Sequence, residues 1–116
     1  MPHILLSTTS NLAENAHTGE ILQALVDRLS ACESVSPEAV KAYHSEFAHW
    51  RMGVGGAKGF VHCQLGLLTG RTLELRKQIA EEISEVLRRE FAFSLSSGEA
   101  KVTVELREME AATYIK

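Results

Sequence analysis

The sequence predicts an α+β fold in which two strand–helix–strand units form one four-stranded mixed sheet, with both helices on one face. The order strand, helix, strand occurs twice, in about residues 2–50 and 58–107, separated by a flexible turn that contains Gly53, Gly55 and Gly56. Both helical segments carry an apolar stripe on one side only. Each half therefore has the pattern of a right-handed βαβ unit with parallel strands, and the 116 residues have the size of one domain.

The first half begins with an apolar strand at residues 2–8, whose consecutive Ile and Leu residues predict a strand covered on both faces. Residues 9–17 are mostly polar, and Asn11 followed by Glu14 predicts a capped short turn. Thr18 is a good N-cap for the helix that follows.

That helix is expected over residues 18–32, because its apolar residues share one stripe: Ile21, Leu22, Leu25, Val26 and Leu29. A loop at 34–37 leads to a second strand over residues 39–50 with mixed faces.

The second half repeats this order. We expect a strand at 58–68, a tight loop at 69–72, a helix from Thr72 as N-cap to about Phe91, a turn at 96–99, a strand at 101–107 and a short arm at 110–116. The helical stripe consists of Ile79, Ile83, Val86 and Leu87. With both helices on one face of the sheet, the other face must be covered by something else, so we expect an oligomer.

Composition excludes several function classes. The net charge is -3 with no basic run, which argues against a nucleic-acid partner. The apolar runs are far shorter than the roughly 20 residues that span a bilayer, and no signal peptide is expected. Cys32 and Cys63 lack metal-ligand spacing, and two free thiols fit a reducing cytoplasm.

Pro2 is the candidate catalytic residue, with two alternative interpretations. If Met1 is removed, Pro2 becomes the N-terminus, and its ring nitrogen is a secondary amine that can act as a general base. If Met1 is retained, the same nitrogen is an amide and Pro2 only leads into an edge strand, where a missing N–H does no harm.

Several segments carry a family resemblance: Met1-Pro2-His3, residues 50–53, residues 60–62 and residues 70–76. Together with the duplicated βαβ pattern, they resemble the tautomerase superfamily, and within it the 5-carboxymethyl-2-hydroxymuconate isomerases. The resemblance implies a fold like that of macrophage migration inhibitory factor and a homotrimer with active sites near subunit boundaries. It also implies catalysis by the N-terminal proline without metal or organic cofactor, in bacterial catabolism of aromatic acids.

The resemblance also implies how a small-molecule carboxylate substrate would be held. The two basic positions of the family correspond to Lys41 and Arg71. Arginine is usual at position 41 and again two residues later, where this chain has Tyr43. Lysine keeps the charge but loses the bidentate fork, so a smaller or less charged enol acid and a different conjugated ketoacid are alternative substrates. Tyr43 is a candidate donor to a carbonyl.

The remaining candidates have structural interpretations beside the functional ones. His62 either orients Pro2 or a substrate carboxylate, or is a hydrogen-bonded strand residue. Arg76 either reaches the same anion or pairs with Glu81 or another neighbour. Trp50 and Phe47 line a pocket or pack between subunits, and we expect packing. His3, His44 and His49 lack the spacing of a metal site. The alternative to an isomerase is a trimeric ligand-binding or structural protein with the same fold.

Overall fold

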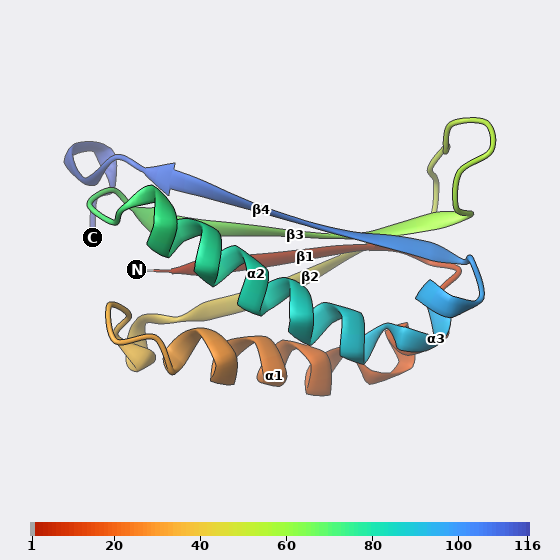
Figure 1. Cartoon of the computed structure of the whole chain (residues 1–116), viewed down its shortest axis with the longest axis horizontal. Helices are drawn as coiled ribbons and strands as arrows, with labels where there is room; N and C mark the ends of the chain where they lie inside the picture. The colour runs from red at the N-terminus through yellow and green to blue at the C-terminus, as the bar shows by residue number, and fades with distance from the viewer. Residues whose placement is uncertain (1) are drawn as a thin grey trace.

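The computed structural model describes residues 2–116, and Met1 lies outside them. Figure 1 shows the strands of one sheet with the long helices packed along them. The strands are β1 (His3–Thr9), β2 (Lys41–Phe47), β3 (Gly59–Leu68) and β4 (Ala100–Met109). The helices are α1 (Thr18–Ser30), α2 (Leu73–Glu90) and the short α3 (Ala92–Ser96), with 3₁₀ turns η1 (Ala13–His17), η2 (Pro37–Ala39) and η3 (Ala111–Thr113).

The sheet has the strand order β2-β1-β3-β4. β1 pairs with β2 and β3 pairs with β4 in parallel, so each half is a βαβ unit, and the two halves meet through the antiparallel pair β1 and β3. The register places Ile4 opposite Leu65 and Val61 opposite Val102, which aligns the apolar positions of neighbouring strands. The predicted duplicated βαβ fold with a mixed sheet is therefore confirmed.

The hydrophobic core lies between one face of the sheet and the two long helices. The strands contribute Ile4, Leu6, Val61, Cys63, Leu65, Leu67 and Val102, and the helices contribute Ile21, Leu25, Leu29, Ile79, Ile83, Val86 and Leu87. Burial raises the pKa of the Cys63 thiol to about 12, so this cysteine is a packing residue rather than a nucleophile at neutral pH. Among residues 2–116, no helix combines the length and the apolar composition needed to cross a membrane.

Among residues 2–116, neither of the long helices covers the opposite face of the sheet (Figure 1). Along β1 the buried residues alternate with half-buried ones such as Leu5, and on β2 the side chains of Tyr43 and Phe47 are 46% and 40% exposed. The prediction that the first strand is covered on both faces is therefore wrong for the single chain. The run of three apolar residues concealed an alternation in which only Ile4 and Leu6 face the helices.

Several predicted boundaries are corrected by the structure. The second strand spans Lys41–Phe47 rather than 39–50, because Pro37 begins a 3₁₀ turn before it. The fourth strand is longer than 101–107, since its pairing with β3 continues to Leu68 and Met109. The predicted cap at Thr72 is confirmed: its side chain accepts a hydrogen bond from the Leu75 N–H at 3.1 Å.

The predicted caps in the first half are wrong. His17 is the N-cap of α1, and the Thr18 hydroxyl instead donates to the carbonyl of Asn15 at 2.9 Å. Asn11 and Glu14 do not form the predicted cap, because the N-cap of η1 is Leu12 and no side-chain cap hydrogen bond is made there. Asn11 contacts a residue 88 positions away in the chain and Glu14 one 80 positions away, which local spacing does not reveal.

Glu14 anchors α3, a helix that the sequence pattern did not predict. Its carboxylate is buried and accepts hydrogen bonds from the backbone N–H of Ser94 at 3.0 Å and from the Ser94 hydroxyl. Both contacts lie in the first turn of α3, where the backbone N–H groups lack partners within the helix. The first half of the chain therefore fixes the start of the segment that leads into β4.

We expect Glu14→Gln to lower the free energy of unfolding by about 1–3 kcal/mol, because one of the two Ser94 donors would then face an amide N–H₂ instead of an oxygen. Urea unfolding measures this difference. Glu20→Gln, at an exposed position of α1, is the matched control and should change stability by less than about 0.5 kcal/mol. Equal effects of the two substitutions would contradict the anchoring role.

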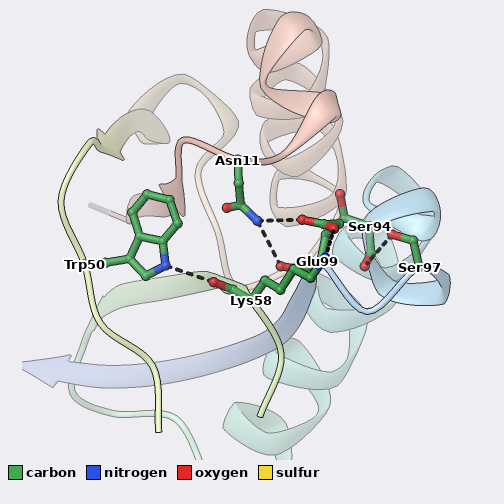
Figure 2. Close-up of polar contacts among 6 residues, drawn as sticks. All are labelled: Asn11, Trp50, Lys58, Ser94, Ser97 and Glu99. Carbon is green, nitrogen blue, oxygen red and sulfur yellow. Dashed lines mark hydrogen bonds and ion pairs between the residues drawn. The ribbon is translucent and has the colours of Figure 1, made fainter. Parts of the chain in front are cut away.

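A second polar network ties three loops together at the same end of the molecule (Figure 2). Asn11 donates to the carboxylate and to the carbonyl of Glu99, both at 3.1 Å, and the Lys58 ammonium donates to the same carboxylate at 3.2 Å. These hydrogen bonds, that of Asn11 first, lower the pKa of Glu99. The Trp50 indole N–H donates to the Lys58 carbonyl at 2.9 Å (Figure 2). This hydrogen bond closes the base of the glycine loop, the projecting segment between β2 and β3 that contains Gly53, Gly55 and Gly56 (Figures 1 and 2).

Candidate active site

One cleft brings together three of the predicted site residues. It has a volume of about 630 Å³, and its lining includes Pro2, Lys41 and Arg71. The cleft lies at the end of the sheet where both chain termini are drawn in Figure 1, opposite the glycine loop. Pro2 precedes β1, Lys41 begins β2 and Arg71 lies in the loop before α2. The parallel pairing of β1 with β2 places the starts of both strands side by side.

Pro2 lies directly before β1 and is buried. Its carbonyl accepts a hydrogen bond from the Lys41 N–H at 3.0 Å, which extends the pairing of the two strands by one position. The ring is therefore held by the sheet at the wall of the cleft. Met1, whose presence decides whether the Pro2 nitrogen is an amine, lies outside the described residues.

Lys41 supplies a cation at the first position of β2. Its ammonium donates one hydrogen bond to the carbonyl of Ala39 at 3.1 Å, and its side chain is exposed. An ammonium has three donors, so the contact with Ala39 leaves two that can bind an anion.

Arg71 is the most firmly held of the three residues. Gly70 adopts a φ of 127°, in the region that favours glycine, and turns the chain between β3 and α2. The Arg71 guanidinium donates to the Ser34 hydroxyl at 3.0 Å, to the Ser34 carbonyl at 2.7 Å and to the Leu68 carbonyl at 3.1 Å. Three of its five donors are thereby occupied, and two are left for an anion.

The charges of the cleft favour an anionic ligand. Lys41, Arg71 and Lys116 contribute three cations to its lining, and Glu38 contributes one carboxylate. The N-terminus of the 18-residue helix α2 begins two residues after Arg71 and adds a partial positive charge. An excess of positive charge in a concave site attracts carboxylates and stabilises negative charge that develops on a bound molecule.

The structure places Tyr43 outside this cleft. Its hydroxyl is hydrogen-bonded to His3 Nδ1 at 3.1 Å, and the other ring nitrogen of His3 is hydrogen-bonded to the Tyr114 hydroxyl at 2.9 Å. Tyr43 and His3 line a separate pocket of about 350 Å³ on the uncovered face of the sheet. Within one chain, Tyr43 therefore does not share a cavity with Pro2.

His62 and Arg76 are not among the residues that line the cleft, although the Arg76 Nε donates to the carbonyl of Arg71 at 3.4 Å. The His62 ring is hydrogen-bonded to Thr103 at 2.7 Å and lies 3.3 Å from a Glu105 oxygen, on the uncovered sheet face. Arg76 pairs with Glu108 of β4 at 3.6 Å rather than with Glu81.

Ser34 and Lys116 are cleft residues that the sequence interpretation did not identify. Both come from segments without regular structure, and neither belongs to a motif with fixed spacing. The serine is separated by 37 residues from the arginine that it contacts. The only local signal is the expected loop at 34–37, which marks an irregular segment but not its contact.

Several solved structures are similar to this fold. A crystal structure of a 5-carboxymethyl-2-hydroxymuconate isomerase from Deinococcus radiodurans R1 is similar, with a TM-score of 0.89, 25% identity and coverage of 99% of this chain and 87% of that chain. A 5-carboxymethyl-2-hydroxymuconate delta-isomerase matches with a TM-score of 0.76, 16% identity and coverage of 100% and 86%. A wild-type fused 4-OT protein, described as a symmetric trimer, matches with a TM-score of 0.66, 22% identity and coverage of 93% and 85%.

None of the curated proteins compared with the chain matches it. A family model, in contrast, matches almost the entire chain: residues 2–116 fit the model of 5-carboxymethyl-2-hydroxymuconate isomerase. The matched range includes all three cleft residues discussed above, Pro2, Lys41 and Arg71. The chain belongs to the 5-carboxymethyl-2-hydroxymuconate isomerase family of the tautomerase superfamily.

Proposed function

We propose that this protein is a cofactor-independent isomerase that moves a proton within an enol ketoacid, most closely a 5-carboxymethyl-2-hydroxymuconate-like substrate. The observation that carries the proposal is the shared cleft of Pro2, Lys41 and Arg71. A candidate base and two candidate carboxylate-binding cations are what this proton transfer needs.

Pro2 is the proton carrier in this proposal. With Met1 removed, its ring nitrogen takes the proton of the 2-hydroxyl group, and the substrate becomes a dienolate. The same nitrogen then returns the proton to a distant carbon of the conjugated system, which forms the new C–H bond and leaves a ketone at C2. One group that accepts and returns a single proton is sufficient, so no second acid is required.

Lys41 and Arg71 bind the substrate carboxylates and offset the negative charge of the dienolate as it forms. Arg71 has two donors available for a bidentate contact, whereas the Lys41 ammonium acts as a point charge. Tyr43 as a donor to a substrate carbonyl and His62 as a group that orients Pro2 or a carboxylate stay predictions. Both residues lie on the uncovered sheet face, and neither lines this cleft within one chain.

An ultraviolet assay with a small panel of enol ketoacids tests this function, using protein whose N-terminus is checked by mass spectrometry. We expect turnover of a hydroxymuconate dicarboxylate, and slower turnover of a monocarboxylate analogue that cannot use both cations. Binding without turnover by protein that lacks Met1 would instead support a non-catalytic ligand-binding member of the family. If neither binding nor turnover is observed, the isomerase role and the ligand-binding role are both contradicted.

The uncovered sheet face supports an oligomer, and the proposal takes it to be a homotrimer, because a similar structure is described as a symmetric trimer. Exposed aromatic side chains such as Tyr43 and Phe47 on this face would be buried by further copies of the chain. Light scattering should therefore give about three times the chain mass of 12.8 kDa. A monomeric mass would contradict this assembly. We place the protein in the cytoplasm, in keeping with two cysteines that form no disulfide.

A further inference from the structure

Arg71 is held on one edge of its guanidinium by a single residue. Ser34 accepts from Nε through its hydroxyl at 3.0 Å and from Nη2 through its carbonyl at 2.7 Å, while Leu68 accepts from Nη1 at 3.1 Å. Two acceptors on the Nε and Nη2 side fix the plane of the group as well as its position. The side chain of Arg71 is half-buried, so water competes only in part for these contacts.

The loop that carries Ser34 is itself anchored in the core. Val35 is 5% exposed and belongs to the hydrophobic core cluster, and its backbone N–H donates to the Cys32 carbonyl at 3.1 Å. The Cys32 N–H in turn donates to the carbonyl of Leu29, in the last turn of α1, at 3.1 Å. Ser34 is therefore a rigid support, and a rigid support is what turns a flexible arginine into a preorganised anion-binding group.

We propose that Ser34 is a positioning residue for Arg71, and that its hydroxyl sets how tightly the cleft binds a substrate carboxylate. Ser34 does not itself bind the substrate in this proposal. Its hydroxyl keeps the two remaining guanidinium donors directed into the cleft, so that little conformational entropy is lost when a carboxylate binds. The inference rests on the proposed function, because it assigns to Arg71 the carboxylate contact described there.

The test measures binding and turnover in four forms of the otherwise unchanged protein: the parent, Ser34→Ala, Arg71→Ala and the double variant. Calorimetric titration with adipate, a six-carbon dicarboxylate, gives Kd without relying on turnover. We expect Ser34→Ala to raise Kd and KM about 3- to 10-fold, since a hydrogen bond to a charged donor is lost while the carbonyl contact stays. The kcat value should change by less than about twofold, because Ser34→Ala leaves Pro2 unaltered and keeps the Arg71 charge that offsets the dienolate.

The double variant separates positioning from an independent contribution. If Ser34 acts through Arg71, Ser34→Ala should have no further effect on Kd once Arg71 is alanine. Ser34→Thr keeps the hydroxyl and should restore the Kd of the parent. Ser30→Ala removes a serine hydroxyl at the end of α1, outside the cleft lining, and should leave Kd unchanged.

The outcomes distinguish the inference from the function on which it rests. If Arg71→Ala weakens adipate binding and Ser34→Ala does not, the positioning role is overturned and the proposed function stands. If Arg71→Ala leaves Kd and KM unchanged, Arg71 is not the carboxylate anchor, and both proposals for this residue fail. A lower melting temperature of Ser34→Ala with an unchanged Kd would assign the serine a purely structural role and overturn positioning.

Discussion

Protein that retains Met1 should lose isomerase activity almost completely, whereas protein that begins with Pro2 should be active. The chemical difference is confined to one nitrogen: an amide nitrogen cannot take up a proton near neutral pH, and a secondary amine can. General base catalysis typically contributes 10²- to 10⁴-fold, so we expect a loss of at least about 10²-fold in kcat. The ultraviolet assay measures the rate, and mass spectrometry of the same samples measures the fraction without Met1.

Pro2→Ala is a second, weaker form of the same test. Removal of Met1 before alanine leaves a primary amine, which still accepts a proton but lacks the ring that holds it at the wall of the cleft. We expect an intermediate loss of kcat with a folded protein, as judged by an unchanged melting temperature to within a few degrees. Equal rates for protein with and without Met1 would remove Pro2 from the mechanism.

Periodicity was sufficient to predict the architecture because each half of the chain obeys simple rules. The stripes of α1 and α2 match the residues that the core buries, with Leu22 and Val26 the half-buried exceptions at the edge of the stripe. The glycine-rich turn separates two parallel βαβ units, and the handedness rule leaves few ways to join them in one sheet.

Contacts between distant segments explain what periodicity missed. α3 has only five residues and depends on the buried carboxylate of Glu14, 80 positions earlier in the chain. The second strand is shorter than predicted because the alternation of residues 48–50 continues beyond the last pair with β1, which ends at Phe47. An alternating pattern shows which side chains share a face, but a segment becomes a β-strand of a sheet only where a neighbouring strand pairs with it.

The candidate site also contains residues that the sequence predicted and residues that only contacts between distant segments reveal. Pro2 and Arg71 lie in family-like segments, and Lys41 was identified by its correspondence to a basic position of the family. The topology brings all three into one cleft. Ser34 was not identified, because a serine in a loop has many uses, and only the folded chain shows it against a guanidinium. Sequence patterns thus identify charged or reactive site residues, and they miss the residues that hold these side chains in place.

Arg71→Ala should reduce kcat/KM by about 10²-fold, mainly through KM. Two charge-assisted hydrogen bonds to a substrate carboxylate contribute on the order of 3 kcal/mol, which corresponds to about this factor. Arg88→Ala is the matched control, since Arg88 is exposed in the last turn of α2, at the end of this helix that lies far from Arg71. It should leave both kinetic constants unchanged. An unchanged KM together with an unchanged kcat in Arg71→Ala would argue against the anchor role.

Arg71→Lys then separates charge from shape. Lysine keeps the positive charge but offers one nitrogen where arginine offers three, so it cannot contact Ser34 and Leu68 and also bind a carboxylate in bidentate fashion. We expect kcat/KM to fall about tenfold, between the values of the parent and of Arg71→Ala. If Arg71→Lys has the kcat/KM of the parent, a positive charge alone is sufficient at position 71, as proposed for the Lys41 ammonium. If it equals Arg71→Ala, the planar group supplies nearly all of the binding, and the lysine at position 41 marks the weaker of the two carboxylate contacts.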